Sequence, residues 1–219
     1  KAEVTHKAEA VLGEKAVFAS NTSTLQISGL ATASARPQNF LGLHFFSPVD
    51  KMPLVEIIVG EKTSEETLAR GFDYVLQIGK TPIVVNDSRG FYTSRVFATY
   101  VMEGLAMLGE GVHPRSIEVA GIKAGMPMPP LALQDEVSLG LSLHVSDQTR
   151  RDVEAEGKTY TVHPGEAVMR TVGELHGRLG KKAGKGFYDY QGKEKSLWPE
   201  LTTLYPPQAE QPTQQELVD

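Results

Sequence analysis

Short apolar runs rich in β-branched residues alternate with helical patterns in the first half of this chain, and this alternation limits the possible folds more than any other feature. The runs cover residues 16–19, 40–45, 54–59 and 82–87. Helical patterns lie between them at residues 25–32 and 64–78, with Ser64 placed as an N-cap and Gly79 as a stop. This order predicts an α/β layer with some parallel strand pairing.

The second half of the chain carries helical patterns and one short strand. The helical patterns cover residues 91–108, 114–122, 131–153 and 163–179. We expect an interruption near Gly140 and a strand over 186–190. The Pro- and Gln-rich stretch 206–212 is typical of a linker. A domain boundary is expected near residues 87–90, where the pattern changes.

Composition excludes several classes of function. The 219 residues include 22 Lys plus Arg against 27 Asp plus Glu, for a net charge of -5, and no cysteine. A mildly acidic chain without a basic run lacks the footprint of a nucleic-acid-binding protein. No apolar stretch approaches the length of a membrane span, and no His, Asp or Glu cluster has metal-ligand spacing. We therefore expect a cytoplasmic protein with no metal site and no nucleic-acid partner.

The two ends of the chain interrupt patterns that look helical. The sequence begins without Met, within a helical pattern that reaches Gly13, and it ends on residues 214–219, which resemble the opening of another helix. We interpret the chain as a piece of a longer polypeptide. A processed or tagged terminus is the alternative.

His44 and Glu56 are the main candidates for chemistry. His44 lies at the end of an apolar strand, where α/β sheets bind their ligands, and an imidazole there can act as a general base. Glu56 lies within the next apolar run, where burial of a carboxylate is costly unless it is paired. The two form a pair if their strands adjoin. The alternative is a lone buried histidine and a solvent-facing glutamate on an edge strand.

Two polar segments are further candidates. Residues 20–23, Ser-Asn-Thr-Ser, follow the first strand and suit hydrogen bonding to a ligand, or else simply cap a helix. Residues 90–95 open a helix whose backbone N–H groups and Arg95 can meet an anion, with ordinary capping as the alternative. Neither segment decides between these alternatives by itself.

Four stretches together resemble the 3-hydroxyacyl-CoA dehydrogenase family. They are Ala-Ser-Asn-Thr-Ser-Thr-Leu at 19–25, Gly-Leu-His-Phe-Phe-Ser-Pro at 42–48 with Leu-Val-Glu-Ile-Ile at 54–58, the segment 79–91, and Gly-Lys-Gly-Phe-Tyr-Asp-Tyr at 184–190. Their order and spacing match over most of residues 1–190. The chain is most similar to the dehydrogenase part of multifunctional fatty-acid β-oxidation subunits.

The resemblance implies a fold and a domain division. It implies the C-terminal part of a Rossmann-type NAD-binding domain at residues 1–88, followed by an all-α domain at 89–205. Residues 206–219 would then be a linker or the start of a next segment. The family's Gly-x-Gly-x-x-Gly loop has no counterpart in these residues, so we expect the chain alone to bind NAD poorly.

The resemblance also implies roles for individual residues. His44 matches the base that takes the proton of the 3-hydroxyl group of an acyl-CoA substrate, and Glu56 matches its orienting carboxylate. Ser23 matches a serine that contacts both substrate and NAD, and Tyr190 matches a tyrosine near the substrate. Where the family commonly has asparagine, this chain has Ser47 near the cofactor and Ser94 near the substrate. The shorter serine side chain implies altered substrate positioning.

The implied activity is the NAD-dependent oxidation of (S)-3-hydroxyacyl-CoA to 3-ketoacyl-CoA. Its implied partners are the acyl-CoA substrate and either a second copy of the chain or a thiolase subunit. Two alternatives stay open. One is a non-catalytic dimerisation or assembly module of the same multifunctional enzyme. The other is a 3-hydroxybutyryl-CoA dehydrogenase with the same catalytic pair.

Overall fold

A four-stranded sheet forms the centre of the first part of the chain. The computed structural model describes residues 1–219, which divide into two compact units, Lys1–Val96 and Phe97–Asp219. The sheet has the order β1 (Phe18–Ser20), β2 (Phe40–Phe45), β3 (Leu54–Val59) and β4 (Thr81–Asn86). β1 pairs with β2 and β3 with β4 in parallel, whereas β2 and β3 are antiparallel. The predicted α/β layer with some parallel pairing is confirmed, although β1 begins two residues later than its apolar run.

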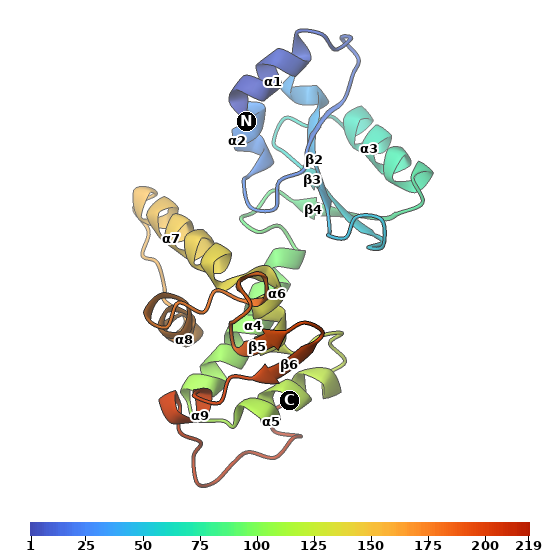
Figure 1. Ribbon diagram of the computed structural model, residues 1–219. Helices are drawn as coiled ribbons and strands as arrows, with labels where there is room; N and C mark the ends of the chain where they lie inside the picture. The colour runs from blue at the N-terminus through green and yellow to red at the C-terminus, as the bar shows by residue number, and fades with distance from the viewer. The chain divides into compact units, whose positions relative to one another are not determined.

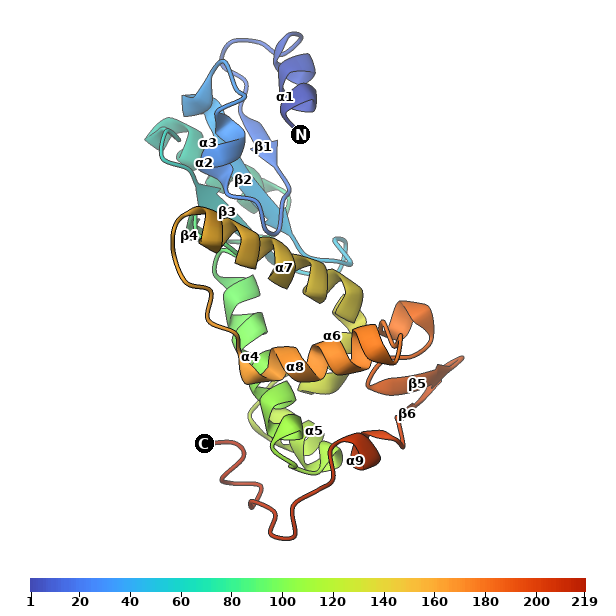
Figure 2. The same cartoon turned by 90° about the vertical axis from the view of Figure 1, so that its left-hand side faces the viewer.

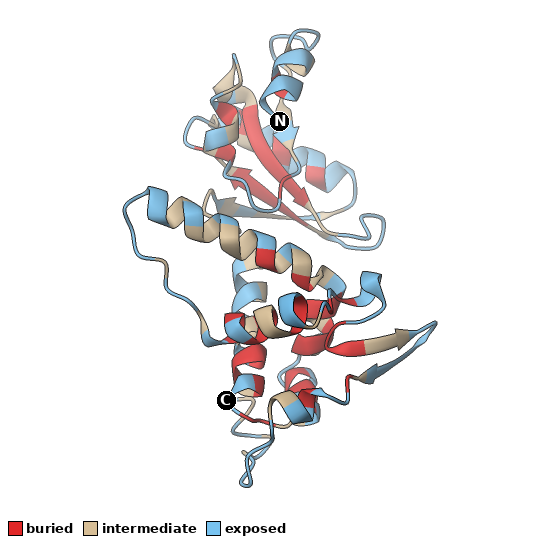
Figure 3. Ribbon diagram, turned by 60° about the vertical axis from the view of Figure 1, so that its left-hand side comes forward, coloured by how far each residue is buried: buried red, intermediate tan, exposed pale blue.

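Helices cover both faces of this sheet (Figure 1). Side chains alternate between the faces along each strand, as the two-residue period of a strand requires. One face packs under α3 (Glu65–Gln77), and its buried cluster includes Leu41 and Ile57. The other face packs against α2 (Ile27–Ala31), and its cluster includes Phe40, Ile58 and Phe91. Figure 3 shows the inner strands as the buried centre of this unit.

The N-terminal segment is tied to the loop that precedes β2. Helix α1 (Ala2–Glu9) ends on Glu9, whose carboxylate accepts the N–H of Ala35 at 2.8 Å. Arg36 donates to the carbonyl of Gly13 at 2.8 Å. Ser64 caps α3 as predicted, because its hydroxyl accepts the N–H of Thr67 at 3.2 Å.

The second unit is mainly helical (Figure 2). Its helices are α4 (Thr93–Gly109), which begins in the first unit, then α5 (Pro114–Lys123), α6 (Pro130–Val137), α7 (Leu139–Ala155), α8 (Pro164–Arg170) and α9 (Leu201–Leu204). They enclose a single large cluster that includes Leu105, Leu131, Leu139 and Phe187. No helix in the structure is both long and apolar enough to cross a membrane.

The second unit departs from an all-α domain in one respect. Strands β5 (Tyr188–Gln191) and β6 (Glu194–Leu197) form an antiparallel hairpin, of which only the first strand is predicted by the sequence. The segment Glu-Lys-Ser-Leu of β6 is mostly exposed, so it carries no apolar alternation that would identify a strand.

Three boundaries in the second unit also differ from expectation. The break between α6 and α7 falls at Ser138, with φ of 86°, rather than at Gly140. The helix expected over 163–179 is shorter, because α8 continues only as a π-helical turn to Leu175. Residues 214–218 form turns instead of opening a helix.

Candidate active site

His44 and Glu56 form a buried pair on one face of the first unit's sheet. They are register partners on the antiparallel strands β2 and β3, so their side chains leave the sheet side by side. The Nδ1 atom of His44 lies 2.6 Å from Oε2 of Glu56. Glu56 is fully buried, and His44 is 7% exposed. Glu56 is therefore not the solvent-facing residue of an edge strand, since β3 has a neighbour on each side.

The carboxylate of Glu56 also caps the start of α4. Its Oε1 atom accepts the backbone N–H groups of Tyr92 at 3.0 Å and Thr93 at 2.8 Å. Its Oε2 atom accepts the hydroxyl of Thr93 at 2.9 Å, in addition to the bond with His44. Burial by itself raises the pKa of Glu56, but the hydrogen bonds from His44, Thr93 and Tyr92 together hold that pKa below its ordinary value. The carboxylate is therefore ionised at neutral pH.

The sequence pattern at residues 90–95 predicts an anion at the N-terminus of this helix, and the protein itself supplies that negative charge. The anion is the side chain of Glu56 rather than a ligand. This arrangement matches the capping alternative for residues 90–95, with the cap contributed by a strand far from the helix in sequence.

A turn with two left-handed residues brings α4 to Glu56. Gly90 has φ of 73° and Phe91 has φ of 49°. The left-handed conformation is unfavourable for a side chain such as that of Phe91. Its ring is nevertheless 1% exposed and packs in the same cluster as Phe40 and Ile58, which stabilises the turn. The turn directs the N–H groups of Tyr92 and Thr93, at the start of α4, at the carboxylate.

Aromatic rings surround the imidazole of His44. The rings of Phe46 and Phe91 lie with their centroids 4.5 Å and 6.0 Å from that of His44. With Nδ1 occupied by Glu56, Nε2 is the nitrogen that remains to exchange a proton with a ligand. The arrangement thus combines an ionised carboxylate, an oriented imidazole and apolar walls, which is the composition of a general acid–base site.

The polar segment after β1 lies beside the end of β2. The Oδ1 atom of Asn21 accepts the N–H of Phe45 at 3.1 Å, one residue beyond His44. The hydroxyl of Thr22 accepts the N–H of Leu25, three residues later, at 3.1 Å. These bonds hold the loop itself, and α2 is capped from elsewhere, so the segment is not the cap of that helix.

Asp87 provides the cap of α2, a role that the sequence did not reveal. Its carboxylate accepts the N–H groups of Ile27 at 2.7 Å and Ser28 at 2.6 Å. The residues are some 60 positions apart, so no local capping pattern signals the contact. Thr93 is likewise a site residue that the sequence analysis missed, because its contact with Glu56 depends on the turn at Gly90 and Phe91.

The other predicted site residues fall into two groups. Ser23 and Ser47 are exposed, on the loops that follow β1 and β2, and the Ser47–Pro48 peptide bond is cis. Ser94 is half-buried in the first turn of α4, next to Thr93. These three serines belong to the same unit as His44.

Tyr190 belongs to the second unit, where its hydroxyl donates to Asp135 at 3.0 Å. Asp135 also accepts the N–H groups of Phe187 at 2.8 Å and Tyr188 at 2.9 Å. Burial raises the pKa of Asp135 to about 6, and burial together with the nearby Asp135 charge raises the pKa of Tyr190. Tyr190 therefore helps to hold the β5–β6 hairpin against α6.

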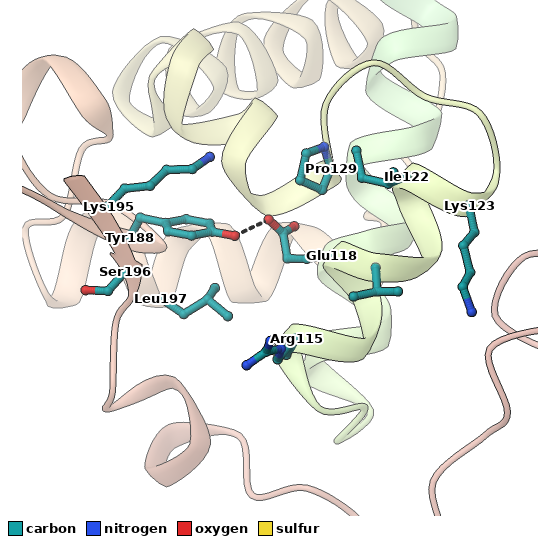
Figure 4. A pocket seen from close by; sticks show the side chains of 10 residues that line it. Arg115, Glu118, Ile122, Lys123, Pro129, Tyr188, Lys195, Ser196 and Leu197 are labelled. Carbon is teal, nitrogen blue, oxygen red and sulfur yellow. Dashed lines mark hydrogen bonds between the residues drawn. The ribbon is translucent and has the colours of Figure 1, made fainter. Parts of the chain in front are cut away.

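Each unit also contains a cavity whose lining includes no histidine. In the first unit, a cavity of about 350 Å³ is lined by residues that include Gln26, Glu61 and Asp87. In the second unit, a cavity of about 460 Å³ lies between α5 and the β5–β6 hairpin (Figure 4). There the hydroxyl of Tyr188 bonds to the buried carboxylate of Glu118. No group of three metal-ligating side chains is close enough to hold a metal ion.

Comparisons with known proteins assign this arrangement to a family. The model of the 3-hydroxyacyl-CoA dehydrogenase NAD-binding domain matches residues 1–88, and that of the C-terminal domain of the same family matches residues 90–190. The chain belongs to the 3-hydroxyacyl-CoA dehydrogenase family. It is thereby a member of a family of NAD-dependent oxidoreductases, as the resemblance implied.

Relatives with known names agree with this assignment. The fatty acid oxidation complex subunit alpha of Shewanella halifaxensis is 42% identical over 196 residues, which are 90% of this chain and 27% of the relative. That of Shewanella sp. strain W3-18-1 is 40% identical over 205 residues, 94% of this chain and 28% of the relative. The chain thus spans little more than a quarter of the length of these relatives.

Solved structures show the same fold. The (S)-3-hydroxybutyryl-CoA dehydrogenase of Ralstonia eutropha matches with a TM-score of 0.77 and 33% identity, over 87% of this chain and 66% of that one. The 3-hydroxybutyryl-CoA dehydrogenase of Escherichia coli K12 matches with a TM-score of 0.74 and 29% identity, over 90% of this chain and 41% of that one. The predicted partial α/β domain followed by a helical domain is confirmed.

Proposed function

We propose that this chain carries the proton-transfer site of an enzyme that oxidises (S)-3-hydroxyacyl-CoA to 3-ketoacyl-CoA in fatty-acid β-oxidation. The observation that carries the proposal is the 2.6 Å contact between Nδ1 of His44 and Oε2 of the buried Glu56. Family membership supplies the reaction class. The geometry supports His44 as the group that exchanges the proton.

The pair sets the direction of proton transfer. An ionised Glu56 accepts the Nδ1 proton, which leaves the lone pair on Nε2 of His44 free. Nε2 takes the proton of the 3-hydroxyl group as the C3–H bond breaks, and the imidazolium that forms is stabilised by the neighbouring carboxylate. In the reverse direction, the protonated imidazole donates to the 3-keto oxygen.

The residues present fit one end of an NAD molecule. NAD, when bound, supplies the acceptor for the hydride that leaves C3. Ser23 and Ser47 present exposed hydroxyls on the loops after β1 and β2, on the side of the sheet edge where His44 lies, and would contact the nicotinamide end. Residues 1–219 contain no Gly-x-Gly-x-x-Gly sequence for the diphosphate.

We propose that Ser23, Ser94 and Tyr190 contact the substrate, as the family resemblance implies. Ser94 lies on the first turn of α4, one residue from the Thr93 that holds Glu56, so a ligand bonded to it would be positioned relative to the same helix end. Tyr190 donates its hydroxyl proton to Asp135. It would therefore meet a substrate through its ring or through a lone pair of its oxygen.

The test replaces the 196 matching residues of the Shewanella halifaxensis alpha subunit by those of this chain and measures NADH oxidation with acetoacetyl-CoA. Activity in this chimera, together with a loss of at least a hundredfold in H44Q, would support the proposal, because general acid–base catalysis contributes about 10²–10⁴-fold. H6Q, on exposed α1, serves as the matched control. An active chimera whose rate H44Q leaves unchanged would contradict the proposal.

A 3-hydroxybutyryl-CoA dehydrogenase is the second candidate. The observation that favours it is the TM-score of 0.77 with the Ralstonia eutropha enzyme of that name. The catalytic pair would be the same, so rates with 3-ketoacyl-CoA substrates of four to sixteen carbons, in ~4-carbon steps, separate the candidates. A strong preference for the shortest substrate would favour the second.

The relatives are named as subunits of a fatty acid oxidation complex, and we extend the proposal to assembly. The chain would associate with a thiolase subunit or with a second copy of itself, in the cytoplasm. A purely structural role in such an assembly is the remaining alternative. An intact complex in which H44Q has no effect on the dehydrogenase rate would favour that alternative.

A further inference from the structure

Thr93 contacts both oxygens of the carboxylate that orients His44. Its backbone N–H donates to Oε1 of Glu56 at 2.8 Å, and its hydroxyl donates to Oε2 at 2.9 Å. Because one residue holds the two oxygens, the plane of the carboxylate is fixed relative to the start of α4. Rotation of the carboxylate would break both bonds together.

The hydroxyl of Thr93 shares its acceptor with the imidazole. Oε2 is the atom that lies 2.6 Å from Nδ1 of His44. Two donors on one oxygen divide its negative charge between them. The hydroxyl therefore limits how strongly Glu56 stabilises the protonated form of His44, while it keeps Oε2 aimed at the ring.

The residue type and the place of Thr93 suit it to hold the Glu56 carboxylate. Thr93 is half-buried and is the first residue of α4, two positions after the left-handed Phe91. A β-branched side chain has few χ1 conformations, so its hydroxyl loses little freedom in making the bond. Valine has the same shape as threonine without the donor, which makes the hydroxyl testable by itself.

We propose that Thr93 is a positioning residue for His44, which acts through Glu56 by fixing the orientation and the charge of Oε2. The proposal rests on the proposed function of the pair. It predicts that the hydroxyl, rather than the shape of the side chain, matters for the rate and its pH dependence.

The experiment compares T93V, T93S and the unchanged residue in the chimera. We expect T93V to lower kcat by about fivefold, the equivalent of one hydrogen bond, with KM changed by less than about twofold. In NADH oxidation His44 acts as the acid, so the alkaline limb of the pH–rate profile should move to higher pH in T93V, because Oε2 then holds the imidazolium more strongly. T93S keeps the donor and should restore both the rate and the profile.

A spectroscopic measurement on residues 1–219 separates this inference from the proposed function. The proton shared by His44 Nδ1 and Glu56 gives a low-field NMR signal, which should shift in T93V and return in T93S. A normal profile and an unshifted signal in T93V, with H44Q inactive, would overturn the role of Thr93 alone. A shifted signal with a fully active H44Q would overturn the proposed function and leave the positioning contact established.

Discussion

At the scale of single residues, the site depends on Glu56 because its two oxygens serve four donors. They bond to His44, to the hydroxyl of Thr93 and to the backbone N–H groups of Tyr92 and Thr93. Since the pKa of Glu56 is lower in the folded chain than in the unfolded one, its contribution to the free energy of unfolding is complete above about pH 4.5 and is lost as the pH falls further.

Replacement of Glu56 by glutamine should therefore reduce stability in a pH-dependent way. At pH 7, E56Q should lower the free energy of unfolding by about 2 kcal/mol, because the amide cannot accept all of these bonds. At a pH low enough to protonate the wild-type carboxylate, the difference should shrink toward zero. Urea titrations at both pH values measure it, with the exposed Glu61 changed to glutamine as the control. An equal difference at both pH values would exclude an ionised, hydrogen-bonded Glu56.

Ser94 offers a second prediction at this scale. The family commonly has asparagine here, whose amide has two donors and a longer reach than a hydroxyl. S94N in the chimera should raise kcat/KM about fivefold or more, because a bond to a dry substrate group contributes about 1 kcal/mol or more. Unchanged kinetics in S94N would show that Ser94 does not position the substrate.

Some of these site residues could be predicted from the sequence, and others could not. His44 could be predicted because a polar residue at the end of an apolar strand is conspicuous, and Glu56 because it interrupts a β-branched run. Thr93 and Asp87 could not be, since each acts on a partner brought near only by a turn or by the sheet. A helix start rich in polar residues indicates that the helix is capped, but it does not show which distant residue provides the cap.

At the scale of elements, the β5–β6 hairpin is held by a buried carboxylate. Asp135 on α6 accepts the N–H groups of Phe187 and Tyr188 and the hydroxyl of Tyr190. Strand β6 itself is mostly exposed and polar, so its pairing follows from this contact and from the turn at Gly192, with φ of 63°. Tertiary contacts of this kind explain why the sequence predicted only one strand of the hairpin.

The contact leaves no room for a side chain at Gly186. A Cβ atom there would overlap the carboxylate of Asp135 and displace it from its donors. G186A should lower the free energy of unfolding by about 2–3 kcal/mol. G140A, in the same unit, would place its Cβ 3.6 Å from the nearest atom and should change stability by less than about 0.5 kcal/mol. Equal stabilities for G186A and G140A would contradict the packing described for the hairpin.

At the scale of the whole molecule, the chain divides into two units that differ in how well the sequence described them. The strands of Lys1–Val96 were located closely because each is a buried apolar run between polar turns. Boundaries in Phe97–Asp219 were less accurate, since helix ends there depend on backbone conformations such as that of Ser138. The order of an α/β part followed by a helical part was nevertheless evident from the change of period near residue 88.

We infer that Glu56 fixes His44 with its Nε2 atom free to exchange a proton. The ¹⁵N chemical shifts of His44 in residues 1–219 at neutral pH test it most directly, because the two ring nitrogens of a neutral imidazole differ according to which one carries the proton. We predict a proton on Nδ1, coupled to Glu56, and a bare Nε2, with this preference lost in E56Q. A proton on Nε2 in the unchanged chain, or the same tautomer with and without the Glu56 carboxylate, would contradict this role of Glu56.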